Sequence, residues 1–470
     1  MSLTISYISQ EYITKKSLWI IVSILLIVNF LLRLLIYYNT NLFSFSDYSA
    51  YLKGIENIAE GEKVYLLNGN FLFAISYIGY FAKYIFGNID YFFILNCLAG
   101  TLATFAIYTL FVKITQSHLG GIIIIILNTF YTEFMVFSSV FYTPVIMIFL
   151  LSLFLLFIYY YLKSSTKLKT FINQFLIIII FLLTFLFKPE LKYLPYFILL
   201  SGIFLIKRDK KLNRIIILSI SLISSYYFLQ ISGLITHPSE NVIANDFVFF
   251  GHTDYGGDGG EGSFVYQENK IRYEAALSEY CKTNNITKPT RKDLNAFHWA
   301  EIRKFVFQHP LKWIALQLIK FFRTFGVVPE GSSFKILYTG LLKGNLWLTS
   351  FIVVIPVVLI ILLFIIFFDI SVLKKLLFST GLNSFDSFSQ SAHSTKNKLK
   401  TINQFNLIYL VIFVYYIIAI IFFGQYQERY RMPVMVVFII PVLSYSIANF
   451  SKNQLMKKTD IFIKSTIIFL

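Results

Sequence analysis

The sequence has few charged residues. They occupy 14% of its 470 positions, whereas a soluble globular protein carries about 25%. Hydrophobic residues make up 57% of the chain, and the mean hydropathy is +0.69. Apolar runs of about 20 residues, the length that crosses a bilayer as a helix, recur along the chain. The composition therefore argues against an ordinary soluble enzyme and predicts a polytopic membrane protein.

Cysteine is almost absent. Cys97 lies in an apolar run and Cys281 in a polar segment, which argues against a disulfide framework and a thiolate metal site. The histidines are scattered, and no His-Glu-x-x-His motif accompanies them, so zinc is not expected. These residues require no cofactor, and the sequence leaves a divalent metal undecided. A cleavable signal peptide is not expected, because the first apolar run, 17–38, is too long.

The apolar runs predict an all-α bundle of about ten to twelve transmembrane helices. Clear spans are expected at 17–38, 91–113, 141–162, 172–187, 190–206, 213–233, 345–368, 404–423 and 432–449. Two weaker runs lie at 70–87 and 119–137.

The formal net charge of +17 comes mainly from basic residues between the spans. Lysine and arginine are concentrated in the connectors 163–170, 207–214 and 369–403, which the positive-inside rule assigns to the cytoplasm. The segments 39–69, 188–192, 234–344 and 425–431 are then extracytoplasmic, in the plasma (inner) membrane. A chain that is outside at 69 and inside at 163 crosses an odd number of times, so one of the two weaker runs is not expected to cross.

Three parts follow from this topology. Residues 1–233 form an N-terminal transmembrane module with the first external loop at 39–69, residues 234–344 an external loop, and residues 345–470 a C-terminal transmembrane module. Within the external loop, the glycine-rich stretch 249–264 is expected to be irregular. The stretch 297–326 has apolar residues at helical spacing with basic residues between them, which predicts a helix along the membrane surface.

The first external loop contains an acid ahead of an amphipathic pattern. Tyr51 and Ile55 belong to an apolar helical face, Glu56 to the polar face, and Gly61 is a C-cap. Asp47 then lies at the N-terminus of a helix on the outer surface. It can be a reactive carboxylate or only a helix cap.

Cations occur at two other external turns. Lys188 stands beside Glu190 in one, and Arg429 and Arg431 flank a tyrosine in the other. Each can meet an anionic group such as a phosphate. The alternatives are snorkelling for Lys188, and an ion pair with Glu428 or a lipid contact for the arginines.

Few polar residues interrupt the predicted spans. A secondary transporter places polar groups near the middle of the membrane on broken helices, whereas this sequence concentrates them at the external surface. The pattern favours chemistry at the interface on a lipid-linked substrate.

The order of these motifs resembles the GT-C glycosyltransferases, in particular the dolichyl-phosphate-mannose protein mannosyltransferase and aminoarabinose transferase group (family 39-like). Asp47, Tyr51 and Gly61 fit the first-loop motif, although Tyr48 stands where a second acid is usual. Lys188 occupies the place of an arginine before proline, and the run Arg429-Tyr430-Arg431-Met432-Pro433 matches a late R-Y-R-x-P turn. The segment around His309-Pro310 is also similar, whereas Thr143-Pro144 stands where a Thr-Glu pair is expected.

The resemblance implies a GT-C-like fold and an inverting transfer of a sugar from a polyprenyl-phosphate donor to a lipid, glycan or protein acceptor. It implies that Asp47 is the general base and that Lys188, Arg429 and Arg431 bind the donor phosphate. No nucleic acid is expected as a partner. Further contacts to the acceptor or loop are expected from Tyr51, Glu56, Glu190, His309, Lys320 and Arg323.

Two other functions stay open at this point. An O-antigen polymerase or ligase also acts on lipid-linked sugars, and would depend on residues such as Arg429 and His309 rather than on Asp47. A transporter or flippase of lipid-linked sugars would move its substrate without covalent chemistry.

Overall fold

The structure of the protein, a computed structural model, describes residues 15–40, 46–62, 64, 74–187, 193–205, 210–233, 243–256, 266–325, 340, 342–367, 405–406, 408–419 and 428–448. Every regular element within these residues is a helix. The all-α class is therefore confirmed.

Within this part of the chain, six helices are long and apolar enough to cross a membrane. They are α1 (Lys15–Asn39), α4 (Asp90–Thr115), α7 (Pro144–Lys163), α8 (Lys167–Phe187), α10 (Lys210–Ile231) and the stretch from α19 (Glu428–Val434) through η5 (Met435–Ile439) to α20 (Ile440–Ala448). A seventh crossing results if α5 (His118–Phe130) and the helices after it, α6 (Thr132–Val136) and η2 (Phe137–Ser139), form one span bent by 68°. Shorter apolar helices are α9 (Leu194–Leu205), α16 (Leu346–Phe367) and Ile408–Ala419. The expected total of ten to twelve spans stays a prediction.

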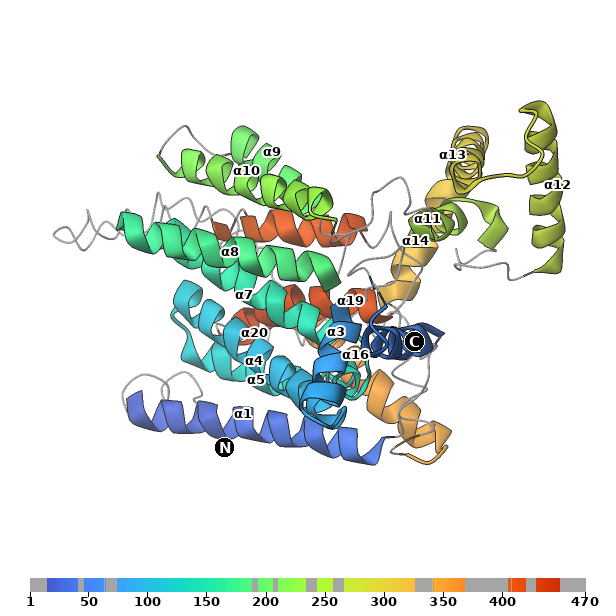
Figure 1. Ribbon diagram of the computed structural model, residues 1–470. Helices are drawn as coiled ribbons and strands as arrows, with labels where there is room; N and C mark the ends of the chain where they lie inside the picture. The colour runs from blue at the N-terminus through green and yellow to red at the C-terminus, as the bar shows by residue number, and fades with distance from the viewer. Residues whose placement is uncertain are drawn as a thin grey trace, which may run out of the picture.

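The long helices lie side by side as a bundle, with α1 along one edge and α9 and α10 along the other (Figure 1). The outward face of α1 is apolar along its length: Ile24, Ile27, Leu31 and Leu35 are each more than half exposed. Such a continuous apolar surface is stable in lipid and unfavourable in water. The protein is therefore a membrane-embedded helical bundle.

One end of the bundle is defined by the contact between α1 and α4. The Tyr37 hydroxyl near the end of α1 donates to Asp90 Oδ1 at the start of α4, at 2.6 Å. We call this the Asn39 end, and the opposite end, where α4 finishes, the Thr115 end.

The weaker run 70–87 does not cross the bundle. Its described part is α3 (Ala74–Tyr80) and the π-helical turn η1 (Phe81–Ile85). Since α1 ends and α4 begins at the Asn39 end, the segment between them starts and finishes there. The Ser76 hydroxyl donates to the Tyr51 carbonyl of the first-loop helix at 2.9 Å, which holds α3 at that end. The run 119–137 instead forms the bent pair of α5 with α6–η2, and if that pair is one span, α4, the pair and α7 make the odd number of passages required.

Basic residues gather at the Thr115 end. Tyr159 of α7 donates to the Lys113 carbonyl at 3.1 Å, and Tyr161 donates to the Arg214 carbonyl at 3.0 Å. These bonds bring together the ends of α4 and α7 with the start of α10, near Lys163 and Lys167. The connector 163–170 and the described start of α10 therefore share one end of the bundle, while the connector 369–403 lies outside the described residues.

The described part of the segment 234–344 forms a separate group of helices beyond the Asn39 end (Figure 1). It contains α11 (Ile243–His252), η4 (Asp254–Gly256), α12 (Gln267–Thr283), α13 (Arg291–Gln308) and α14 (Pro310–Phe325). Its small core packs the Phe249 ring against Tyr255 and His298.

Two predictions for this loop were wrong in detail. The stretch 297–326 is not one helix, because α13 ends at Gln308 and α14 begins at Pro310. Proline is favoured at the first helical position, where its missing N–H is not needed. The stretch 249–264 is not irregular throughout, since residues 249–252 belong to α11.

Candidate functional site at the Asn39 end

Asp47 lies in the first turn of α2 (Ser46–Ala59), as expected. The helix ends at Gly61, whose φ of +80° is the left-handed conformation that a glycine C-cap adopts. Tyr51 and Ile55 are buried on its inner face, and Glu56 is exposed on the other. The predicted amphipathic helix is thus confirmed, and its apolar face packs on protein.

The contacts of Tyr51 place the first turn of α2 beside the start of α7. Its ring lies 5.9 Å from that of Tyr142, two residues before α7 begins. Asp47 is one helical turn before Tyr51. Because α7 also packs against α19, the helices that carry Asp47 and the paired arginines meet the same element.

A buried ion pair joins α19 to the bent span. Arg431 is 3% exposed and binds the Glu133 carboxylate through two nitrogens, with Nε at 3.0 Å from Oε2. The Tyr131 hydroxyl donates to the same carboxylate at 2.5 Å, and Arg431 Nη1 donates to the Thr324 carbonyl of α14 at 3.2 Å. A bidentate arginine–carboxylate pair with further hydrogen bonds is the arrangement in which buried charges are tolerated.

This geometry favours the ion-pair interpretation of Arg431, with a different acid from the one expected. Its partner is Glu133 rather than Glu428. The pair fixes α19 against α6 and α14, and so sets the position of Arg429 at the preceding turn. The side chains of Arg429 and Asp47 are outside what the structure describes, as are Lys188 and Glu190 altogether.

A second buried cation lies close to the first. Arg33 of α1 donates through Nη1 to the Phe134 carbonyl at 2.7 Å and to the Ser138 hydroxyl at 2.5 Å, and its Nε donates to Asn29 at 3.0 Å. Its guanidinium also lies 4.2 Å from the centre of the Phe134 ring. Gly100 makes room for it, since a Cβ there would lie 2.4 Å from Nη1.

Polar side chains around Arg33 continue the network. Thr101 and Asn29 are linked at 3.0 Å, Asn29 donates to Thr129 at 2.9 Å, and Asn96 donates to the Phe137 and Ser138 carbonyls. The bundle interior is therefore more polar at the bend of the α5–α6 span than the sequence suggested. Individually these residues are uncharged, so the hydropathy of each run concealed them.

The helix α14 turns its polar side inward. Gln317, Lys320 and Thr324 are buried, whereas Leu311, Leu318 and Phe322 are at least half exposed. Gln317 donates to the Gly251 carbonyl at 3.1 Å, which attaches α14 to α11. Burial lowers the pKa of Lys320 to about 7. The outward apolar face agrees with a helix lying along a membrane.

The other predicted contacts are dispersed. His309 is exposed at the junction between α13 and α14, with its ring 5.7 Å from that of Phe305. Arg323, one helical turn after Lys320 in α14, is exposed. In the part of the chain that is described, no group of three acidic, histidine or cysteine side chains could hold a metal ion. The expectation that no cofactor is required stays a prediction.

From the sequence alone, Glu133 is only a charge that interrupts the apolar run 119–137. The signal that could have found it is the pairing of unusual charges. An ionisable residue inside a span needs a partner, and Arg431 beside a span was the available cation of opposite sign.

No protein-family model, curated protein or solved structure matches this chain. The function is therefore argued from the site itself.

Proposed function

We propose that the protein is an integral membrane glycosyltransferase that moves a sugar from a polyprenyl-phosphate donor to an acceptor at the outer face of the membrane. The observation that carries the proposal is the position of α2 and α19. The acid-bearing helix α2 contacts the residues just before α7, the double-arginine helix α19 packs against α7, and the Glu133–Arg431 pair anchors α19.

In this proposal Asp47 is the general base. It removes a proton from the acceptor hydroxyl or amine as that group attacks the anomeric carbon, and the configuration inverts. The bond to the polyprenyl phosphate breaks, and negative charge grows on the leaving phosphate. Arg429 and Lys188 stabilise that charge, whereas Arg431 acts as a positioning residue through Glu133.

The assignment to the extracytoplasmic face rests on charge. Lys113, Lys163, Lys167 and Arg214 come together at the Thr115 end, which the positive-inside rule directs to the cytoplasm. The Asn39 end, with α2 and α11–α14, then faces outward. The donor phosphate is proposed to lie there, at the depth of the outer headgroups.

The test uses purified protein in detergent with a panel of undecaprenyl-phosphate sugars and a membrane lipid extract. Released undecaprenyl phosphate is measured for the native protein, Asp47→Asn and Glu60→Gln. We expect release to fall by at least a hundredfold in Asp47→Asn and to stay within twofold in Glu60→Gln, which changes an exposed acid directly after the same helix. Equal release by native protein and Asp47→Asn would refute the role of Asp47, and no release from any donor would refute the transferase.

The second candidate is a transporter or flippase of lipid-linked sugars. The polar network around Arg33 at a bent span favours it, because transporters place polar groups on broken helices. The same preparation, reconstituted in vesicles, separates the two functions. Movement of a labelled sugar lipid across the bilayer without release of its phosphate carrier would support the transporter and contradict the transferase.

A further inference from the structure

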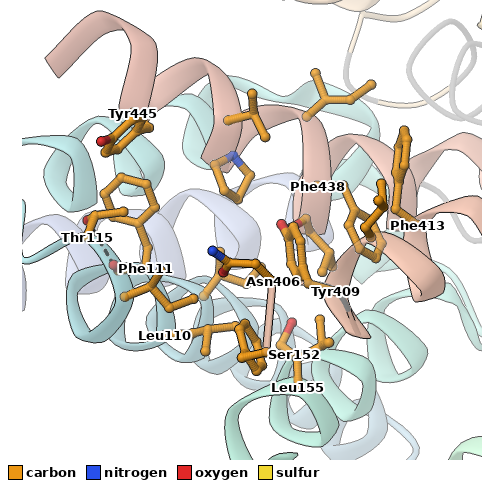
Figure 2. Close-up of a pocket in the computed structure, with 18 residues that line it drawn as sticks. Leu110, Phe111, Thr115, Ser152, Leu155, Asn406, Tyr409, Phe413, Phe438 and Tyr445 are labelled. Carbon is orange, nitrogen blue, oxygen red and sulfur yellow. Dashed lines mark hydrogen bonds between the residues drawn. The ribbon is translucent and has the colours of Figure 1, made fainter. Parts of the chain in front are cut away.

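An apolar cavity of about 260 Å³ lies inside the bundle toward the Thr115 end. Its walls come from α4, α7, the helix Ile408–Ala419 with the two residues 405–406, and η5–α20. Figure 2 shows Phe111, Leu155, Phe413 and Phe438 arranged around this space. A cavity of about 150 Å³ holds benzene, so this one has room for roughly ten carbon atoms, about two isoprene units.

The polar groups at the cavity wall are used within the protein. The Thr115 hydroxyl donates to the Phe111 carbonyl at 2.9 Å, and the Ser152 hydroxyl donates to the Ile148 carbonyl at 2.7 Å. The Tyr409 hydroxyl donates to the Val437 carbonyl. These three donors are directed to backbone, and apart from Asn406 and Tyr445 the other lining side chains are apolar, so the chemistry of the wall suits a hydrocarbon.

One wall is built from irregular helix. Val437, Phe438 and Ile439 belong to the π-helical turn η5, and Tyr409 binds a carbonyl within it. A π-helical turn widens the helix locally, and such turns are frequent at functional sites. Here the π-helical turn supplies three residues of the cavity wall, and the interior beside it stays open.

The cavity and the proposed phosphate site share one helix. The stretch Glu428–Ala448 carries Arg429 and Arg431 at one end and the wall residues Phe438 and Tyr445 further along. At about 1.5 Å per residue, Phe438 lies about 10 Å and Tyr445 about 20 Å from Arg431 along the axis. A lipid with its phosphate at Arg429 has its hydrocarbon chain at the depth of the cavity.

We infer that the cavity receives part of the isoprenoid chain of the donor lipid. The inference rests on the proposed function for the identity of the lipid, and on the cavity, its apolar wall and its shared helix for the location. It adds a second recognition element, remote from the reacting atoms, that selects a long isoprenoid carrier.

The test is a binding measurement that needs no sugar transfer. A polyprenyl phosphate with a photoreactive diazirine near its ω end is irradiated with purified full-length protein in lipid nanodiscs, and labelled peptides are identified by mass spectrometry. We expect label within 107–115 or 437–445. Ser152→Phe fills the cavity and should reduce this label at least tenfold, whereas Ser152→Ala, which removes only a hydroxyl bonded to its own helix, should retain it.

Competition identifies the source of the chain. Excess undecaprenyl phosphate should remove the label, and excess phosphatidylglycerol should leave it. Equal competition by phosphatidylglycerol would overturn the isoprenoid assignment in favour of an acyl chain. Label confined to the lipid-facing surface of α1 in the native protein would overturn the cavity as a site.

A separate measurement checks that the variants fold. Val442→Trp fills the cavity from the opposite wall, and thermal unfolding is recorded for each variant. If both filling variants unfold, the label position in the native protein alone decides. Label in the cavity without any sugar transfer would retain the lipid site and refute only the proposed function, so the two failures are distinguishable.

Discussion

The interiors of the two ends of the bundle differ in polarity. At the Asn39 end the helices enclose Arg33, Glu133 and Arg431, each at most 3% exposed, with asparagine and hydroxyl side chains around them. Toward the Thr115 end they enclose an apolar cavity whose wall hydroxyls bind backbone. The difference teaches that charge in this protein is buried where the chain bends or where helices from distant segments meet. An apolar space is left unfilled where long helices run parallel.

The largest effect is expected from breaking the buried ion pair. Arg431→Met leaves Glu133 as an uncompensated buried charge, which costs about 3–5 kcal/mol. We expect a strongly lowered thermal unfolding midpoint in detergent, measured by intrinsic fluorescence. The double variant Glu133→Leu/Arg431→Met should recover most of the loss, because no charge is left unpaired. A double variant as unstable as the single one would show that the pair is not a coupled unit.

The next effect is expected at Gly100. Gly100→Ala places a Cβ against the Arg33 guanidinium, at 2.4 Å from Nη1 in the present geometry, and overpacking costs about 1–3 kcal/mol. The matched control, in the part of the bundle toward the Thr115 end, is Ser444→Ala, which removes a buried hydroxyl bonded to its own helix. Equal unfolding midpoints for the two variants would contradict the tight fit of Arg33.

Toward the Thr115 end, the position at which substitution is expected to lower stability most is Tyr409. Tyr409→Phe deprives the Val437 carbonyl of its donor at the π-helical turn, and an unsatisfied buried group costs about 1–3 kcal/mol. We expect a smaller loss of stability than for Arg431→Met, together with faster hydrogen exchange across 435–441. Unchanged exchange there would show that the turn does not depend on Tyr409.

The smallest effect concerns the α11–α14 group that covers the polar end. Burial lowers the pKa of His298 to about 4, below the ordinary value of about 6.5. Between these values the unfolded chain binds a proton that the folded one does not, so stability falls as pH decreases from 6.5 toward 4. We expect a loss of about 1 kcal/mol between pH 7.5 and 5.5.

The matched variant for this titration is His298→Phe. It keeps a flat ring against Phe249, whose centre lies 4.2 Å from that of His298, and removes the ionisable group. The pH dependence of the unfolding midpoint for this group of helices should become shallower in the variant. An identical slope in both proteins would assign the titration to another residue.

Much of the bundle was predictable from the sequence. The expected span 91–113 corresponds to α4, and 141–162 to α7, because a helix in lipid must satisfy its backbone hydrogen bonds internally and be apolar over its length. The first-loop helix was also predictable, since Tyr51 and Ile55 repeat at helical spacing ahead of a glycine cap. These are local properties, read within one or two dozen residues.

The charge pairing was not predictable in the same way. Glu133 and Arg431 are separated by 298 positions, so no local pattern connects them. Their contact also changes the interpretation of Arg431, from a phosphate ligand in the sequence argument to a proposed positioning residue. Whether the run 70–87 crosses the bundle was equally undecided. The contact between Tyr37 and Asp90 answered this, because it places the end of α1 beside the start of α4.

By itself, the sequence determined that this protein is a membrane-embedded helical bundle, where its long helices lie, and that an acid begins its first loop helix. Hydropathy and helical periodicity depend on each residue and its near neighbours, and both can be read along the chain. Only the tertiary structure decided which charges pair, which run stays at one end and where a cavity remains. Those features depend on residues that approach one another from distant helices, and on the space that their side chains leave.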